Sequence, residues 1–169
     1  MAIYRAWNGP APTTAAQASV AVANGVKTML QLATPSTGQI QLIGWGYTID
    51  VAPAGIGTVE LLETDVAATV TAHVASGLVK SDPNAPNSTL TLGTSATGYT
   101  ATVEGTITAT RVFGGYKIPV AAGSTDLTRD WQWLYGLGPI VAVSKFCRVR
   151  TTFTATTPTM LCYIDYIHI

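Results

Sequence analysis

The segment from Tyr99 to Val112, Y-T-A-T-V-E-G-T-I-T-A-T-R-V, decides the fold class of this chain. Its even positions from 100 to 110 hold threonine or glutamate, whereas positions 99, 101, 103, 107 and 109 hold Tyr, Ala, Val, Ile and Ala. Successive side chains of a β-strand point to opposite faces, so this alternation predicts one strand with an apolar face and a hydroxyl-bearing face. Such half-buried strands are typical of antiparallel sheets, because parallel sheets are covered on both faces.

The composition favours the same class. The chain has 169 residues, which suits one domain, and 27 of them are threonines, whose β-branched side chains suit strands. Charged residues make up only 11%, against roughly 25% in an average soluble domain, so hydroxyl groups carry much of the expected solubility. Nine basic residues balance nine acidic ones, which argues against nucleic acid or an anionic membrane as a partner.

The same patterning continues along most of the chain. Runs of β-branched and apolar residues between turn residues predict further strands. These runs cover residues 26–33, 39–50, 58–64, 88–92, 140–154 and 160–169, and less clearly residues 66–77. Gly44 and Gly46 inside the second of these runs indicate a bulge or a close backbone approach. We therefore expect an all-β, antiparallel β-sandwich, jelly-roll-like, over residues 25–169, preceded by an extended N-terminal arm over residues 1–24.

Two aromatic residues stand out in the expected arm. Tyr4 and Trp7 lie in a segment rich in Ala, Thr and Pro that has no clear period. Aromatic rings in such a segment bury area only by docking on something, either the parent sandwich or a neighbouring subunit. The run of residues 164–169, I-D-Y-I-H-I, is likewise expected to pair in a sheet or at a subunit contact, because its apolar residues would otherwise be exposed.

A second aromatic cluster lies in the irregular region of residues 121–139. On a strand, Trp131, Trp133 and Tyr135 would all point the same way and form an aromatic platform. This platform fits a core plug under a long loop, an anchor in a partner's pocket, or a surface that stacks on a sugar. These three residues, with Tyr4 and Trp7, are the candidate partner-binding residues.

No catalytic or metal-binding constellation emerges from the sequence, and we expect neither an enzyme nor a cofactor. His73 and His168 lie in no recognisable partner motif, and Cys147 falls on the apolar face of its predicted strand. The strands that hold Cys147 and Cys162 are consecutive, and a hairpin turning near Thr157 would place Cys147 opposite about residue 167, so the register does not imply a disulfide between the two. The chain also lacks a signal-peptide core and any run near the ~20 apolar residues that span a bilayer, so we expect a soluble protein made in the cytoplasm.

Three segments resemble small β-rich virion proteins of tailed bacteriophages. They are V-E-L-L-E-T-D-V-A-A-T-V-T-A-H-V-A-S-G (59–77), Y-T-A-T-V-E-G-T-I-T-A-T-R-V-F (99–113) and V-S-K-F-C-R-V-R (143–150). The chain from about Val26 onward is most similar to capsid decoration, or cement, proteins. The resemblance implies a β-sandwich or barrel that forms a homotrimer, binds the major capsid protein and stabilises the outer capsid surface of the virion. An alternative is a carbohydrate- or host-surface-binding module, such as an adhesin or a tail-associated protein.

Overall fold

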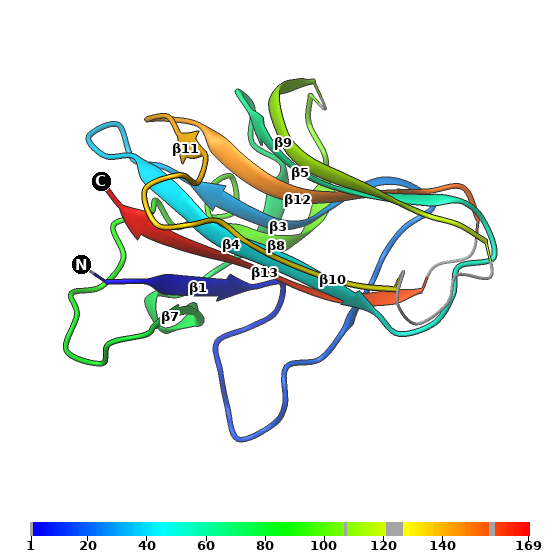
Figure 1. The fold of residues 1–169 in the computed structure, drawn as a ribbon, viewed down its shortest axis with the longest axis horizontal. Coiled ribbons are helices and arrows are strands. Elements are labelled where there is room, and N and C mark those ends of the chain that lie inside the picture. Colours follow the sequence, from blue (N-terminus) through cyan, green and yellow to red (C-terminus); the bar gives the residue numbers. More distant parts are fainter. Residues whose placement is uncertain (1, 107, 121–126, 156–157) are drawn as a thin grey trace.

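The computed structural model describes residues 2–106, 108–120, 127–155 and 158–169. The chain is all-β, and two antiparallel sheet layers pack together as a β-sandwich (Figure 1). A single turn of 3-10 helix, Ala75–Gly77, interrupts the described strands. The predicted antiparallel sandwich is confirmed, whereas the strand order does not confirm the finer jelly-roll assignment.

The first layer is built around the C-terminal strand. Its strands run in the order β10 (Thr128–Gln132), β4 (Ile40–Ile49), β13 (Thr159–His168), β1 (Tyr4–Trp7) and β7 (Leu78–Lys80). Two short strands extend this layer: β11 (Ile140–Val141) pairs with β4, and β2 (Val20–Ala21) pairs with β13. We call it the first sheet.

The second layer has two three-stranded parts. One has the order β12 (Phe146–Phe153), β5 (Gly57–Thr64) and β9 (Ala109–Ile118), and the other has the order β3 (Gly25–Ala33), β8 (Gly98–Val103) and β6 (Thr69–Ala72). The two parts meet where β3 lies alongside β12. A parallel bridge between Asn24 and Phe153 marks this junction.

Residues 99–112, which the alternation predicts as one strand, contribute to two strands in the structure, β8 and β9. β8 pairs with β3 and β6, whereas β9 pairs with β5 in the other part of the layer. The chain turns at Gly105, whose φ of 63° lies in the left-handed region and where an added Cβ would lie 2.8 Å from the Ala67 carbonyl oxygen. The preceding Glu104 points into the protein and accepts hydrogen bonds from the amide and hydroxyl of Thr28, both at 2.6 Å. Ile107 lies outside the described residues.

The bulge expected near Gly44 and Gly46 is present in β4. Asp165 of β13 is opposite Gly44 and Tyr166 is opposite Leu42, so Ile43 is the extra residue. The bulge shifts the alternation by one residue. The buried apolar residues of β4 are therefore Ile40 and Leu42 before the bulge and Trp45, Tyr47 and Ile49 after it.

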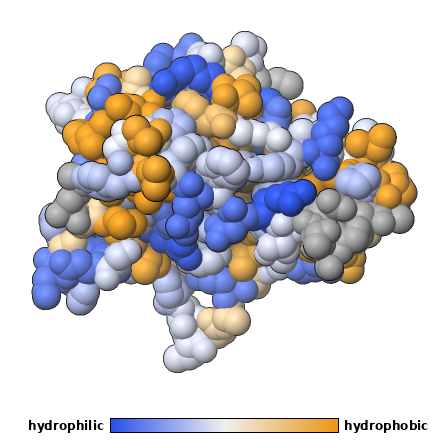
Figure 2. Space-filling view, in the orientation of Figure 1, coloured by the Kyte–Doolittle hydropathy of each residue, from blue (hydrophilic) through white to orange (hydrophobic). Residues whose placement is uncertain are grey.

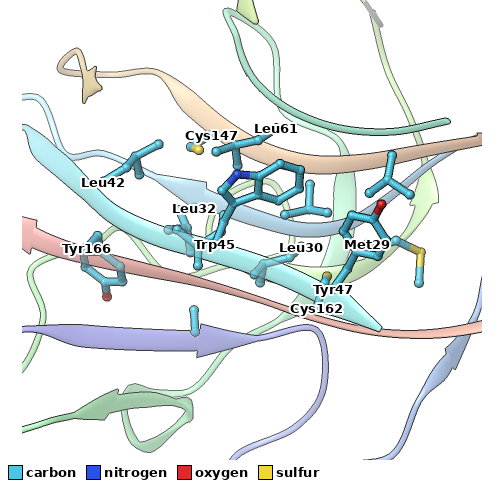
Figure 3. Close-up of a cluster of buried hydrophobic side chains, with 14 of the residues drawn as sticks. Met29, Leu30, Leu32, Leu42, Trp45, Tyr47, Leu61, Cys147, Cys162 and Tyr166 are labelled. Atoms are coloured by element: carbon cyan, nitrogen blue, oxygen red, sulfur yellow. The ribbon is translucent and has the colours of Figure 1, made fainter. Parts of the chain in front are cut away.

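The core fills the space between the two layers (Figure 3). Trp45 and Tyr47 of β4 face residues of the second layer such as Met29, Leu30 and Leu61. The Trp45 ring centroid lies 6.0 Å from that of Tyr47 and 5.9 Å from that of Tyr116 on β9. Aromatic packing thus joins β4 of the first sheet to β9 of the second layer.

The expectation of an extended arm over residues 1–24 is not confirmed at its start. Tyr4–Trp7 form β1, which lies between β13 and β7 and pairs with both. Beyond Trp7 the side chain of Asn8 continues the pairing, because its Nδ2 donates to the Met160 carbonyl at 2.9 Å and its Oδ1 accepts from the Cys162 amide at 2.8 Å. Local sequence patterns miss β1 because its partner strand lies about 160 positions further along the chain.

Three further predictions from the pattern are corrected. Residues 140–154 form two strands, β11 and β12, which belong to different layers. Residues 88–92 form no strand; only Leu92 takes part in an isolated bridge, with Thr97. β12 and β13 are not a hairpin, because β12 pairs with β5 and β13 with β4, and Cys147 and Cys162 are buried free thiols.

Candidate functional site

The structure separates the two aromatic residues of the expected arm. Tyr4 is buried, its ring stacks on Tyr166 with centroids 5.5 Å apart, and its hydroxyl donates to the Pro86 carbonyl at 3.0 Å. Trp7 is half-buried and lies beside Tyr163, its registered partner on β13. Tyr4 therefore docks on its own sandwich, and of the two only Trp7 reaches the surface.

The second aromatic cluster divides in a similar way. Trp131 lies on β10 opposite Trp45, and the Trp133 amide donates to the Ile43 carbonyl just past the end of β10. These two rings line one cleft, as their alternating positions predict. Tyr135 lies in the turn that follows and is exposed. The alternation therefore correctly predicted a common face for two of the three rings.

The cleft that Trp131 and Trp133 line lies at the side of the sandwich where β10 and β9 are the outer strands. It has a volume of about 280 Å³ and is lined by Trp45, Phe113, Gly114, Gly115, Tyr116, Trp131 and Trp133. We call it the edge cleft. Gly114 leaves room for the indole of Trp45, which would lie 3.1 Å from a Cβ added at this glycine. Two guanidinium groups flank the rings, with Arg129 Cζ 5.4 Å from the Tyr116 centroid and Arg111 Cζ 5.1 Å from that of Phe113.

A group of exposed apolar side chains adjoins the edge cleft. Its members, which we call the apolar edge, are Trp131, Leu134, Tyr135, Leu137 and Ile140. Leu134 and Leu137 are 76% and 72% exposed. In Figure 2 apolar side chains gather over β11 and the loop that precedes it. Exposed apolar groups that cluster in this way are typical of interaction sites, whereas single ones are common on any surface.

The loop that carries the apolar edge is fixed at both ends. After Trp133, the Leu137 amide donates to the Leu134 carbonyl at 2.9 Å, and Gly136 takes a φ of 80°. Gly138 packs so closely that a Cβ there would lie 1.7 Å from the Leu42 carbonyl oxygen, and the Leu42 amide donates to the Pro139 carbonyl at 2.9 Å. The apolar side chains are therefore presented by a loop held on β4, and little ordering is needed when a partner binds.

A buried carboxylate holds β11 beside this loop. Glu63 of β5 accepts hydrogen bonds from Arg111, from Thr110 and, at 3.2 Å, from the Ala142 amide. Arg111 also donates to the Ile140 carbonyl at 2.6 Å. Burial alone would raise the pKa of Glu63, but the hydrogen bonds from Arg111, Ala142 and Thr110 together lower the pKa below its ordinary value.

We expect Glu63→Gln to lower the free energy of unfolding by about 2 kcal/mol near neutral pH, because the charged hydrogen bonds to Arg111 are lost. The folded-state pKa of Glu63 is lower than its unfolded value, so its contribution is present above the unfolded pKa of about 4.3 and disappears as the pH falls through the folded pKa. Urea unfolding at several pH values checks this. A difference between wild type and variant that stays constant down to strongly acid pH would contradict it.

The two histidines and two cysteines do not line the edge cleft. His73 is buried and its Nε2 lies 2.9 Å from the Trp7 carbonyl, while His168 contacts Ser88 and Thr89. Burial raises the pKa of both cysteine thiols, and a thiol held neutral is a poor nucleophile. In the parts of the chain that the structure describes, no group of three His, Cys, Asp or Glu side chains could hold a metal ion.

No described helix is long and apolar enough to cross a membrane.

Several residues of these surfaces were not among the candidates from sequence. Leu134 and Leu137 belong to the run W-L-Y-G-L-G-P, where apolar residues beside turn glycines are a signal that could have been used. Phe113 and Tyr116 flank a glycine pair in F-G-G-Y, which on a strand indicates a close approach.

Comparison with protein-family models, with curated proteins and with solved structures finds no match to this chain.

Proposed function

We propose that the protein is a structural virion protein that decorates the outer surface of a bacteriophage capsid. It binds the major capsid protein and stabilises the shell by binding alone, without catalysing a reaction. The observation that carries the proposal is the apolar edge, a cluster of exposed apolar side chains on a loop whose two ends are fixed to β4. The resemblance of three sequence segments to phage decoration proteins supports the choice of partner.

The scaffold suits a role of this kind. A protein that binds the assembled shell, and not its separate subunits, stabilises the shell by mass action. Many copies can then be retained together even if each contact is weak. Such binding needs a preformed contact surface on a rigid sheet, because ordering a flexible loop would consume part of the binding energy. The apolar edge has this property.

Association of the protein with itself, as the homotrimer that the resemblance implies, belongs to the same proposal. The sequence predicted that residues 164–169 pair in a sheet or at a subunit contact. They pair in the first sheet, where Ile164, Tyr166 and Ile167 are buried in the interior strand β13. A contact between copies therefore needs a surface other than β13, and the apolar edge stays assigned to the shell. Light scattering of wild type and of edge variants distinguishes a surface used between copies from one used on the shell.

The test replaces Leu134 and Leu137 together by serine. If these side chains fill a pocket of the capsid protein, each contributes about 2 kcal/mol, and the double variant should bind shells more than about 100-fold more weakly. Co-sedimentation with particles assembled without the protein measures this binding. The same particles should retain their genome to a higher temperature with wild type than with the variant.

The matched control replaces Val51 and Ile56 by serine. Both are exposed to a similar degree, at 60% and 55%, but follow β4 at the other end of the sandwich (Figure 1). This control should bind shells as wild type does. Equal shell binding by the edge variant and wild type would refute the proposal, provided that both unfold at the same temperature.

A further inference from the structure

The outward face of the first sheet carries a hollow that shell binding through the apolar edge does not use. It has a volume of about 340 Å³ and lies over β1, β13, β4 and β10, with Arg5, Trp7, Asp130, Gln132 and Tyr163 among its lining residues. A second hollow of about 410 Å³ shares Arg5 and Gln132 with the first. The two hollows adjoin at these two side chains, and we call the pair the sheet trough. Each part has a size that suits a small ligand.

The floor of the sheet trough is built from planar groups that contact one another. The Trp7 and Tyr163 rings have centroids 5.2 Å apart at an angle of 56°, and Arg5 Cζ lies 4.0 Å from the Tyr163 centroid and 5.3 Å from that of Trp7. Tyr163 lies across Gly46, where a Cβ would come within 2.7 Å of its ring, and its hydroxyl donates to Asp130 on β10. A side chain at position 46 would displace this ring, so the glycine allows Tyr163 to lie close to β4.

The charged groups of the sheet trough already contact other groups of the protein. Arg5 donates to both carboxylate oxygens of Asp165, at 2.7 and 2.6 Å. Asp130 accepts from Tyr163, and Lys80 donates to the Ala85 carbonyl at 2.8 Å. The guanidinium of Arg129, which also borders the hollow, lies 5.4 Å from the Tyr116 centroid. A strongly charged ligand would therefore have to displace these contacts, whereas a neutral ligand rich in hydroxyl groups would find acceptors and donors in fixed positions.

These features together match one chemical class. A sugar ring has an apolar C–H face that packs on an aromatic ring and a rim of hydroxyl groups that bond to carboxylate and amide side chains. The edge cleft does not offer this combination, because its lining is almost entirely aromatic and glycine. The two joined hollows suit a chain of sugar residues better than a single one.

We propose that the sheet trough binds a neutral oligosaccharide, which packs on Trp7 and hydrogen-bonds to Asp130 and Gln132. This activity goes beyond the proposed shell binding and does not depend on it. On β10 the two surfaces use opposite sides, since Trp131 lines the edge cleft while Asp130 and Gln132 line the trough. A capsid-bound copy could therefore present the trough while its edge is occupied.

The test is affinity electrophoresis of the full chain in native gels that contain dextran, laminarin, β-mannan or galactan, with polygalacturonate as an anionic comparison. We expect at least one neutral polysaccharide to slow the wild type. Trp7→Ala should abolish the shift, and Asp130→Asn and Gln132→Ala should each weaken binding about tenfold or more, as expected for the loss of a hydrogen bond to a charged or polar group.

Two controls separate binding from folding. Trp7→Tyr retains an aromatic ring and should keep most of the binding, and Lys117→Ala, exposed on β9, should bind as wild type does. Migration unaffected by every neutral polysaccharide, retardation by polygalacturonate alone, or equal retardation of wild type and the trough variants would each overturn the proposal. The trough variants should still bind shells and the edge variants should still bind polysaccharide, so failure of one proposal is distinguishable from failure of the other.

Discussion

Deletion of residues 1–8 is expected to destabilise the protein by roughly 5 kcal/mol or more, a loss comparable with the whole free energy of unfolding of many domains. The deletion removes β1 from between β13 and β7, so two strands lose their ladder partner at once. It also removes the buried Tyr4 and Ala6 side chains. The Cys162 amide and Met160 carbonyl then lose the hydrogen bonds of Asn8.

Urea unfolding followed by tryptophan fluorescence measures this loss. The control replaces residues 12–16, which are exposed and lie between β1 and β2, with glycine and serine at the same length. That change should alter the free energy of unfolding by no more than about 0.5 kcal/mol. If the deletion and the loop replacement unfold at the same urea concentration, β1 is dispensable and this account of the N-terminal segment is wrong.

The second large effect is expected from Glu104→Ala, which should cost roughly 3–5 kcal/mol because it leaves a buried arginine without its carboxylate. The Arg148 side chain is fully buried, with Nη1 3.9 Å from Glu104 Oε2. It donates to the carbonyl oxygens of Val66 and Glu104. Burial lowers the pKa of Arg148 to about 10, so the group is still charged at neutral pH. The variant also leaves the Thr28 amide and hydroxyl without their acceptor.

Thermal unfolding of matched variants tests this assignment. Asp65→Ala removes the partner of Lys145 in an exposed ion pair and should cost less than about 1 kcal/mol. Combining Glu104→Gln with Arg148→Met replaces the buried pair by uncharged groups and should recover part of the stability that Glu104→Ala loses. If Glu104→Ala and Asp65→Ala lower the free energy of unfolding equally, the buried pair contributes no more to stability than the exposed one.

Local alternation predicted much of the sandwich because it reports which face of a strand is buried. The strand over residues 58–64 followed from it, and so did the common side of Trp131 and Trp133. It failed at Glu104 and Gly105, since threonine and apolar residues go on alternating on both sides of the turn. The alternation of residue types therefore continues across a turn where the strand itself ends.

The surfaces were harder to predict because they depend on strands that meet from distant parts of the sequence. The sheet trough needs Trp7 of β1 beside Tyr163 of β13 and Asp130 of β10, and nothing near Trp7 in sequence indicates either partner. Tyr135 was assigned to a strand face, but Gly136 turns the chain directly after it. Long-range pairing and turn conformation, rather than residue type, decide these positions.

The pairing of β1 with β13 also sets the order in which the molecule can be completed during synthesis. β1 leaves the ribosome first among the described strands, yet the strand that it needs on one side is translated last. At roughly 5–20 residues per second, Tyr4 and Trp7 wait some seconds before that partner exists. During this interval the nascent chain exposes aromatic groups that the finished sheet covers, and closure of the first sheet has to wait for β13, with the high contact order typical of slow-folding β proteins.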